Sequence, residues 1–471
     1  MITELLKNEF IDIVGQENYE DSPASKLVYS FDATPNYQAM PDAILSPRDK
    51  KEVAEIVKLC NQHKIPIIPR GSGTNLSAGT TPLEGGIVLL FKHLDQILEI
   101  DEENLTITVQ PGVNTLEMIQ TVEEIGLFYP PDPSSMKISQ IGGNISENSG
   151  GLRGLKYGVT RDYVLGLEIV LPNGEIIRTG GKLAKDVAGY DLTRLFVGSE
   201  GTLGIVTEAI LKLIPKPETK KTMLALYDSM EAAAQTVSTI IANRVIPATL
   251  EFLDQPTLKV VEEFSKIGLP TDVEAVLLIE QDGPIQSVQT DMDKIATICV
   301  QSGALKVDVA KSEFEAEQLS TARRSALSAL ARLKPTTILE DATVPRSEIA
   351  NMVRAINEIA SKYQVEICTF GHAGDGNLHP TCMTDARNKE EMHRVEQALE
   401  EIFKKAVSLG GTITGEHGVG AMKAPYLHLK LGEEGIAAMQ ALKQAFDPNN
   451  IMNPSKIFAK SSRKRIVVSQ S

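Results

Sequence analysis

The glycine-rich segment at residues 69–79, with the sequence PRGSGTNLSAG, restricts the fold of this chain more than any other feature. It follows the apolar run Ile65–Ile68, which indicates a short buried strand. Glycine reaches positive φ without a Cβ clash, and small neighbours leave the main chain accessible, so successive backbone N–H groups can surround an anion. We interpret the segment as an anion-binding nest, for which a pyrophosphate is a suitable ligand.

The nest does not match the two common phosphate-binding motifs. A G-x-G-x-x-G fingerprint would need a glycine where Leu76 stands, and residues 80–82 (TTP) do not open a helix. A P-loop would need a closing Gly-Lys-Ser/Thr, which this segment lacks. Taken alone, an ordinary glycine-rich connection remains the alternative interpretation.

Length, charge and cysteine usage exclude several classes of protein. A chain of 471 residues predicts two or three domains, and a net charge of −15 disfavours binding to nucleic acid or to an anionic membrane surface. The sequence has neither an apolar run of about 18 residues nor a secretory signal at its start, so we expect a cytoplasmic protein without direct membrane insertion. Its four cysteines are scattered, which is typical of a reducing compartment.

Two further stretches of small residues follow in the first half of the chain. Residues 142–151 have the sequence GGNISENSGG and come after the loop-rich block 129–135. Residues 198–204, GSEGTLG, precede a strand predicted at 205–213. Because glycine, serine and asparagine replace bulk in all three stretches, a long ligand lying against the backbone would explain them together.

The pattern of elements restarts after the proline-rich run 215–218, which indicates a domain boundary. The elements expected beyond it are strands at 222–227, 248–253, 274–280 and 304–310, with helices near 229–243 and 284–301. This alternation predicts an antiparallel sheet covered by helices, which is an α+β unit.

Two short glycine-rich motifs hold the side chains best suited to chemistry. The first, GHAGDGNLH at 371–379, lies between two predicted strands, so a hairpin would bring His372 and His379 face to face. The second, GEHGVG at 415–420, adds Glu416. Two imidazoles and one carboxylate are a typical set of divalent-metal ligands with an open position for substrate.

Other interpretations of these motifs stay open. Cys368 and Cys382 could join the two histidines in a closed structural zinc site, although both cysteines lie in predicted strands, where small apolar packing is their usual role. A metal-dependent hydrolase would use the same two histidines and the same carboxylate as ligands.

Arg323 and Arg324 lie on a helix predicted at 314–332. Adjacent side chains on a helix diverge by about 100°, so we expect at most one of them to serve a site while its neighbour meets solvent or the cap surface. A bidentate clamp on a substrate carboxylate and a surface salt bridge with a nearby glutamate are the two interpretations.

Together these motifs resemble those of the FAD-linked oxidase family, whose FAD-binding domain has the PCMH-type fold of vanillyl-alcohol oxidase. The resemblance runs from about Asp42 to Phe458 and is greatest to the glycolate oxidase and D-lactate dehydrogenase branch. It implies an α+β fold in three parts. These are a two-lobed PCMH-type FAD-binding domain at 1–216, an α+β cap at 217–425, and a C-terminal segment at 426–471 that returns to the flavin domain.

The resemblance implies that the first part of the chain binds FAD, with the pyrophosphate in the nest. No histidine lies within the nest, where related enzymes attach flavin covalently, so we expect the FAD to be non-covalent. The residues that the resemblance assigns to the cofactor are Arg70, Gly71, Ser72, Gly73, Thr74, Asn75, Leu76, Pro131, Asp132, Ser135, Gly142, Gly143, Asn144, Asn148, Ser149, Gly151, Glu200, Gly204, Ile205 and Asn453.

The resemblance also implies roles for five polar side chains of the second part. His372, His379 and Glu416 would bind a divalent metal, zinc or manganese. His417 would act as the catalytic base, and Arg323 would bind the substrate carboxylate.

Two departures from the family pattern bear on the substrate. Ser320 and Leu339 replace an aromatic residue and a lysine that related enzymes carry, which favours a small 2-hydroxy acid such as glycolate or D-lactate. We therefore expect an FAD-dependent 2-hydroxy-acid dehydrogenase.

The route by which electrons leave is a separate expectation. The chain lacks a four-cysteine cluster for an iron–sulfur centre, so the resemblance implies an iron–sulfur partner subunit or another electron acceptor. Such a partner would hold the protein at the inner face of the membrane. A non-catalytic FAD-binding subunit of the same kind of complex is the alternative.

Overall fold

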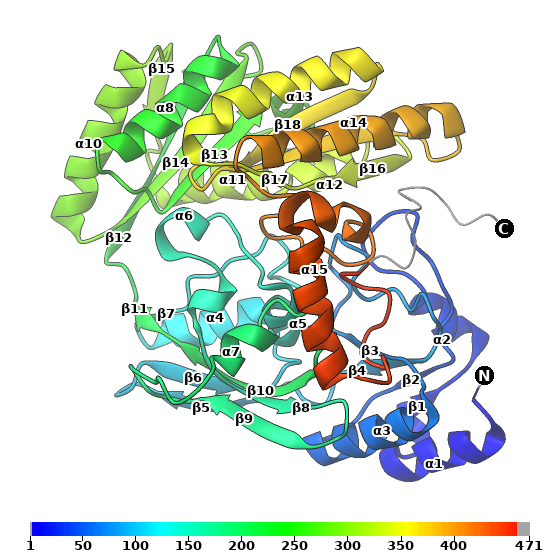
Figure 1. Ribbon diagram of the computed structural model, residues 1–471. Helices are drawn as coiled ribbons and strands as arrows, with labels where there is room; N and C mark the ends of the chain where they lie inside the picture. Colours follow the sequence, from blue (N-terminus) through cyan, green and yellow to red (C-terminus); the bar gives the residue numbers. More distant parts are fainter. Residues whose placement is uncertain (1, 459–471) are drawn as a thin grey trace.

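The computed structural model describes residues 2–458 of the chain, which form two stacked halves (Figure 1). The base, residues 2–215, holds sheets of four, five and two strands, and the two-stranded sheet pairs β7 (Leu127–Phe128) with β11 (Ile214–Pro215). The cap, residues 219–408, holds one sheet of eight strands. Helices and sheets occur in both halves, which confirms the predicted α+β class.

The first base sheet positions the nest. Its strands run in the order β1 (Tyr19–Glu20), β2 (Ala43–Leu45), β4 (Ile87–Leu90) and β3 (Ile67–Arg70). Both β2 and β3 are parallel to β4, and α3 (Lys50–His63) connects them. Strands of a parallel sheet are buried on both faces, which explains their continuous apolar runs. The carboxyl end of β3 opens directly into the glycine-rich segment.

The second base sheet is antiparallel. Its strands, in spatial order, are β5 (Ile97–Asp101), β6 (Thr106–Val109), β10 (Ile205–Lys212), β8 (Val164–Val170) and β9 (Ile176–Gly180), with β10 inserted between the β5–β6 and β8–β9 hairpins. Other helices of the base are α1 (Glu4–Val14), α2 (Pro23–Val28), α4 (Thr115–Glu124) and α7 (Leu192–Phe196). Strands β8 and β9 form a hairpin whose turn has the sequence PNG at residues 172–174.

A short helix, α5 (Ile141–Glu147), lies where the sequence showed only small residues. Glycine and serine are weak helix formers, so propensity did not predict it. Close packing explains the glycine, because a Cβ on Gly142 would lie 2.6 Å from the Cβ of Pro111. The helix ends at Asn148, which has a left-handed backbone with φ of 53°.

The cap sheet is antiparallel throughout, as predicted. The spatial order is β15-β12-β14-β13-β18-β19-β16, and β17 pairs with β19. The bounds are β12 (Thr219–Tyr227), β13 (Thr249–Asp254), β14 (Ala275–Gly283), β15 (Lys306–Val309), β16 (Thr336–Leu339), β17 (Ala342–Thr343), β18 (Glu366–His372) and β19 (Asn377–Thr384).

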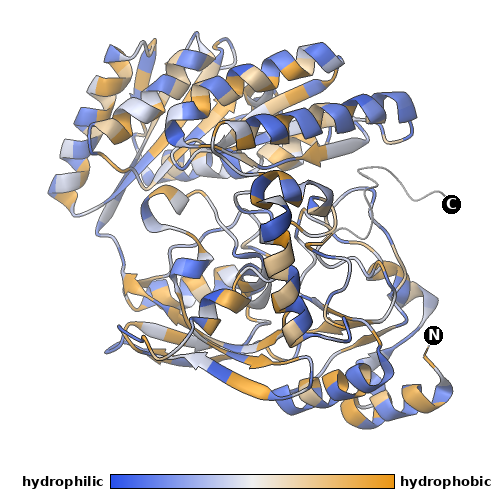
Figure 2. Cartoon of the chain, in the orientation of Figure 1, coloured by the Kyte–Doolittle hydropathy of each residue, from blue (hydrophilic) through white to orange (hydrophobic). Residues whose placement is uncertain are grey.

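Helices cover both faces of the cap sheet (Figure 1). The outer layer consists of α8 (Met230–Ala242), α10 (Ile285–Gln301), α13 (Ile349–Tyr363) and α14 (Lys389–Ser408). The layer next to the base consists of α9 (Gln255–Ser265), α11 (Glu313–Arg324) and α12 (Ala326–Leu330). These helices mix apolar and polar residues, with blue polar positions on the outside of the outer layer (Figure 2). The predicted helix 314–332 is interrupted at Ser325.

The C-terminal helix α15 (Leu427–Phe446) runs from the cap down onto the base (Figure 1). Tyr426, just before it, packs on Phe403 of α14 with ring centroids 5.1 Å apart. Phe446, at its end, packs on Phe196 of the base with centroids 5.5 Å apart. The predicted segment 426–471 extends beyond this part, and residues 459–471 lie outside the described residues. Across residues 2–458, we find no helix with the length and apolar character needed to cross a bilayer.

An ion pair between Arg324 and Asp132 joins the two halves, and it corrects the expectation that Arg324 meets solvent or the cap surface. The Arg324 side chain is 19% exposed, and its guanidinium donates to Asp132 Oδ2 of the base at 3.0 Å. Asp132 is 1% exposed, and Arg153 approaches the same carboxylate at 3.7 Å. The carboxylate is therefore a buried anchor for α11.

We expect Arg324→Met to lower the free energy of unfolding by about 1–3 kcal/mol, between the values for exposed and buried ion pairs. The cause is that Asp132 stays buried with only the more distant Arg153 beside it. Urea titration followed by circular dichroism measures the change. Arg387→Met is the control, because Arg387 is 81% exposed and its pair with Asp385 should contribute less than about 1 kcal/mol. Equal effects of the two substitutions would show that the Arg324 pair does not join the halves.

Candidate active site

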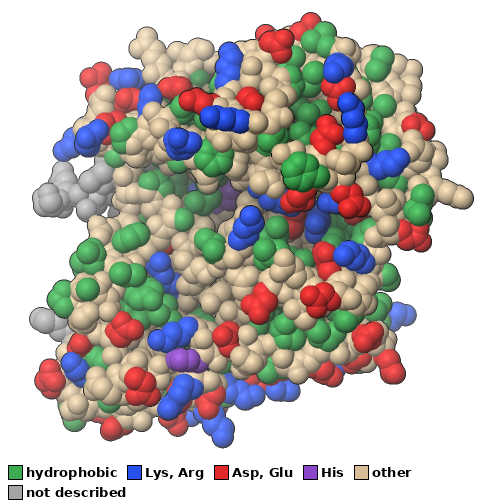
Figure 3. Space-filling model, turned by 180° about the vertical axis from the view of Figure 1, so that it is seen from behind, with side chains coloured by type: hydrophobic (Ala, Val, Ile, Leu, Met, Phe, Trp, Pro, Cys, Tyr) green, Lys and Arg blue, Asp and Glu red, His purple; other side chains and the backbone are tan. Residues whose placement is uncertain are grey.

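A cavity of about 570 Å³ lies between the base and the cap. On the face shown in Figure 3, histidine is visible in a hollow between the upper and lower halves. The residues that the sequence assigned to FAD and that line this cavity are Arg70, Gly71, Ser72, Gly73, Thr74, Asn75, Leu76, Ser135, Gly142, Gly143, Asn144, Ser149, Glu200, Gly204, Ile205 and Asn453. Pro131, Asp132, Asn148 and Gly151, also assigned to FAD, lie outside its lining.

The nest uses its side chains to shape the loop and leaves backbone N–H groups free. Arg70 turns back, donating to the carbonyl of Phe31 at 2.7 Å, and Asn75 Oδ1 accepts from the N–H of Gly79 at 2.7 Å. Gly73 has φ of +70°, and a Cβ there would collide with the Arg70 guanidinium. The backbone N–H groups of residues 72–76 donate to no other described residue, so they fit an anionic cofactor group.

The far wall of the cavity is open at Gly143. A Cβ built on Gly143 meets no described atom within 4 Å, so this position leaves space for a large ligand. Glu147, on the same helix, lines the cavity with one buried carboxylate oxygen that has no hydrogen-bond partner among the described residues. Burial and the nearby charge of Glu200 raise the pKa of Glu147 well above its ordinary value.

The hairpin β18–β19 brings His372 and His379 together, with a register that differs from the expected one. His372 pairs with Asn377 and His379 pairs with Phe370, so the two histidines are diagonal neighbours on one face rather than direct partners. Their ring centroids are 5.1 Å apart and the rings are perpendicular. Gly376, with φ of +89°, closes the turn between the strands.

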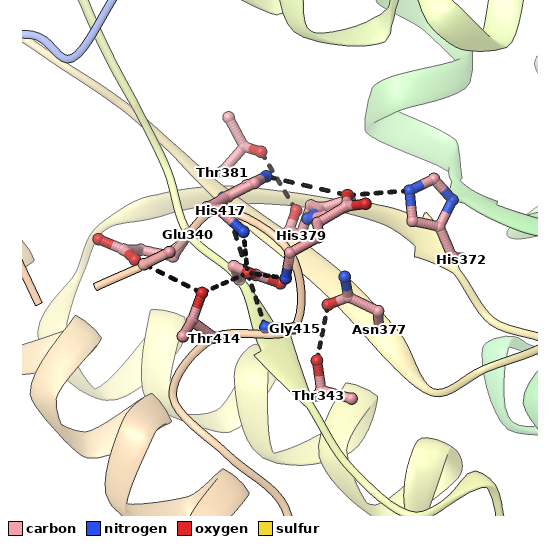
Figure 4. A network of polar contacts seen from close by, with 12 residues as sticks. Glu340, Thr343, His372, Asn377, His379, Thr381, Thr414, Gly415 and His417 are labelled. Atoms are coloured by element: carbon pink, nitrogen blue, oxygen red, sulfur yellow. Dashed lines mark hydrogen bonds and ion pairs between the residues drawn. The ribbon is translucent and has the colours of Figure 1, made fainter. Parts of the chain in front are cut away.

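Glu416 completes a three-residue cluster with these histidines. Figure 4 shows His372, His379 and His417 within the surrounding polar network. Its Oε1 lies 3.0 Å from His372 Nε2 and 3.2 Å from His379 Nε2. Ligands bound to a metal at about 2.0–2.2 Å lie roughly 3.0–3.5 Å apart, so the donor set and its spacing fit a divalent ion. Burial lowers the pKa of His372, but the carboxylates of Glu251 and Glu416 outweigh this effect and raise the pKa well above its usual value. The surroundings of the cluster therefore stabilise a positive charge.

His417 lies beside this cluster, and its backbone N–H donates to Asp341. Its ring stacks on His379 with centroids 5.1 Å apart, and its Nδ1 makes no hydrogen bond to the described residues. Burial lowers the pKa of His417 to about 4, so the imidazole is neutral at neutral pH. A neutral imidazole with a free nitrogen can accept a proton.

Two buried carboxylates hold the loop that carries Glu416 and His417. Asp341 Oδ2 accepts the backbone N–H groups of Gly415, Glu416 and His417 at 2.8–2.9 Å. Glu200, which the sequence assigned to FAD, accepts the N–H groups of residues 419 and 420 at 2.7 Å. Glu200 thus lines the cavity and also docks this loop on the base.

Asp341, His379 and His417 form a second group whose candidate ligand atoms lie within 4.8 Å of one another. Lys423 is buried beside it, with its Nζ 3.8 Å from Asp341 Oδ2. A cation is therefore already present at this group, and its charge opposes a second metal ion.

Arg323 reaches the cavity from α11 and is 3% exposed. Its Nη2 lies 2.5 Å from Glu251 Oε2, and its guanidinium covers the ring of Phe370 at 4.8 Å. This contact is a close ion pair without hydrogen-bond alignment, because Arg323 Nε and Nη2 make no hydrogen bond to the described residues. Nε has neither an ion-pair nor a hydrogen-bond partner among the described residues, and Arg323 lines the cavity, so its guanidinium can face a ligand carboxylate.

The alternative zinc site with two cysteines does not form. Cys368 packs with α9 and α12 on the base-facing side of the cap sheet, whereas Cys382 packs with the outer helices. The two thiols lie on opposite faces, and both are buried and free. They pack as small apolar side chains, as the strand positions predicted.

Glu251 and Asp341 are the polar residues of this site that the sequence patterns did not single out. Glu251 is an acidic residue inside the apolar strand β13, and Asp341 follows Glu340 at the end of β16. A carboxylate in an otherwise buried strand is costly unless it is paired, which is the one signal that could have marked Glu251.

Comparison with known proteins agrees with this arrangement. Residues 41–180 match the model for an FAD binding domain, and residues 216–457 match the model for the C-terminal domain of FAD linked oxidases. The chain is 73% identical over 467 residues to glycolate oxidase subunit GlcD of Bacillus subtilis (strain 168), with 99% of each chain covered. It is 36% identical over 456 residues to a D-lactate dehydrogenase of Anaerostipes hadrus, with 94% of each chain covered.

A solved structure shows the same fold at low identity. The structure of p-cresol methylhydroxylase with substrate bound superposes with a TM-score of 0.79 at 18% identity, covering 96% of each chain. Two matched models that together span most of the chain, and relatives aligned over nearly all of it, lead to one assignment. This chain belongs to the FAD-linked oxidase family.

Proposed function

We propose that this protein oxidises a small 2-hydroxy acid, glycolate or D-lactate, to the 2-oxo acid with FAD as the hydride acceptor. One observation carries the proposal: a single cavity is lined both by the nest and by the cluster of His372, His379 and Glu416. The named relatives, a glycolate oxidase subunit and a D-lactate dehydrogenase, support the substrate class.

The bound groups supply chemistry that side chains cannot. FAD, when bound, supplies the two-electron acceptor, and we propose that it is held non-covalently by the backbone of residues 72–76. A zinc or manganese ion, when bound by His372, His379 and Glu416, supplies a Lewis acid for the substrate hydroxyl. Release of the yellow cofactor by acid precipitation would agree with non-covalent binding.

The side chains around these groups would orient the substrate and move its proton. Arg323, which lines the cavity, would bind the substrate carboxylate through its guanidinium. His417 would accept the hydroxyl proton, a role supported by its neutral ring and unpaired Nδ1. The Arg323 side chain is 3% exposed and the His417 side chain 11%, so both lie largely out of bulk solvent.

The apolar part of the lining supports a small substrate. Leu339, Leu327 and Phe370 line the cavity on the cap side. Among the described Lys and Arg residues of the cap, only Arg323 and Arg324 line it, and Arg324 pairs with Asp132. Ser320 lies in a separate cavity of about 190 Å³, so it carries no argument about substrate size.

Electrons would leave through a protein partner or an external acceptor. The four cysteines, all of them described, are buried at scattered positions and cannot hold an iron–sulfur cluster. We propose an iron–sulfur subunit as the partner, supported by the word subunit in the names of two relatives. Binding to that partner would place the protein at the inner face of the membrane.

The central prediction is that glycolate or D-lactate bleaches the flavin absorbance under anaerobic conditions. Removing metal with a chelator should abolish the bleaching and leave FAD bound, and added zinc or manganese should restore it. A non-catalytic flavin subunit would show no bleaching with any hydroxy acid. A metal-dependent hydrolase would show no flavin spectrum at all.

We expect Arg323→Lys to raise the hydroxy-acid concentration for half-maximal flavin reduction at least about tenfold, since a lysine cannot reproduce the bidentate fork and the lost pair is worth roughly 2–5 kcal/mol. Stopped-flow reduction at varied substrate concentration measures it. Arg332→Lys, at an exposed position of the same half, is the control and should leave the value unchanged. An unchanged value for Arg323→Lys would mean that another group binds the carboxylate.

A further inference from the structure

We propose that Glu251 is a positioning residue that holds a metal ligand and the substrate-binding arginine in one network. The inference rests on the proposed function of His372 and Arg323 and adds a residue that joins them. A carboxylate that touches both groups would couple the affinity of the metal site to the geometry of the carboxylate clamp.

The alternation of β13 directs Glu251 toward the cavity side of the cap sheet. Leu250 and Phe252 pack with the outer helices, whereas Leu253 packs with α9 and α12 on the base-facing side. Because side chains alternate along a strand, Glu251 shares the base-facing side with Leu253. The antiparallel pairing of Phe252 with Gly371 then brings Glu251 opposite His372.

Glu251 makes close contacts with both partners at once. Its two oxygens lie 2.8 and 3.0 Å from His372 Nδ1, and Oε2 lies 2.5 Å from Arg323 Nη2. The Glu251 side chain is 0% exposed, so both contacts are shielded from solvent. His372 Nε2 faces Glu416 at the same time, which leaves the ring one orientation.

The charges agree with this arrangement. The Arg323 guanidinium faces the Glu251 carboxylate from α11, and the His372 ring faces it from β18. A carboxylate that accepts from Nδ1 fixes the histidine tautomer that presents Nε2 to a metal and makes the ring a stronger ligand. The same carboxylate holds Arg323 in the cavity wall through its 2.5 Å contact with Nη2.

Stability alone does not account for Glu251. A buried ion pair is often no more stabilising than apolar side chains of similar volume, and the neighbours of Glu251 along β13 are apolar. The same sheet offers a matched carboxylate, Glu280 on β14, which is 7% exposed and lies outside the lining of the main cavity. Glu280 therefore separates the effect of removing a buried charge from the effect of position.

The test measures manganese binding to the FAD-loaded, metal-stripped protein without substrate, from the electron paramagnetic resonance signal of free Mn²⁺. Glu251→Gln should weaken Mn²⁺ binding by about 10- to 100-fold, the usual cost of losing an outer partner of a metal-bound histidine. FAD content should stay unchanged, and Glu280→Gln should bind Mn²⁺ like the unsubstituted protein. Glu251→Asp, which keeps the charge on a shorter side chain, should recover part of the loss.

The outcomes separate this inference from the proposed function. If the unsubstituted protein binds Mn²⁺ and Glu251→Gln binds it equally well, Glu251 does not position His372 and the inference is overturned. If the unsubstituted protein binds neither Mn²⁺ nor Zn²⁺, the metal site of the proposed function is wrong, and the inference about Glu251 is then overturned as well. Equal weakening by Glu280→Gln would reveal a general effect of lost charge and would also overturn the inference.

Discussion

The loop that carries Glu416 and His417 is fixed by two buried carboxylates, one from each half of the molecule. Asp341 of the cap takes three successive backbone N–H groups, and Glu200 of the base takes two more further along the loop. Charge-assisted bonds of this kind are short and directional, so the loop has one arrangement only when both halves are in place. Lys423, buried between Glu340 and Asp341, balances part of the negative charge.

This clamp explains how two differently built halves make one site. The base contributes mainly backbone donors, free N–H groups at residues 72–76 and open space at Gly143. The cap contributes side chains with titratable or charged heads on β18, β19 and α11. Backbone donors suit a cofactor that is bound in the same way in every turnover, whereas side chains suit the proton and metal chemistry of a substrate.

Sequence patterns predicted much of this arrangement and missed parts that depend on packing. The apolar periods and the two histidine motifs are local signals, and they predicted the cap sheet and the convergence of His372, His379 and Glu416. Strand register is a property of paired strands, so the diagonal placement of the two histidines was not accessible. Helix α5 depends on the close contact of Gly142 with Pro111. Helix propensities describe single residues and therefore cannot predict such a contact.

Sequence patterns also did not predict the ion pairs between residues far apart in the chain. The partner of Arg324 is Asp132, 192 positions away in the chain, and the partner of Arg323 is Glu251 on another strand. Helical geometry predicted that the two arginines diverge, yet it could not say that both would meet buried carboxylates rather than solvent. Asp132, assigned to the cofactor by its motif, turned out to anchor α11 outside the cavity lining.

Anomalous diffraction at the zinc edge, from crystals of the FAD-loaded protein grown with zinc, tests most directly whether His372, His379 and Glu416 bind a metal. The account predicts one peak about 2.0–2.2 Å from His372 Nε2, His379 Nε2 and a Glu416 oxygen, inside the cavity that also holds the flavin. A peak between Asp341, His379 and His417, or a fully loaded crystal without a peak near either group, would contradict it.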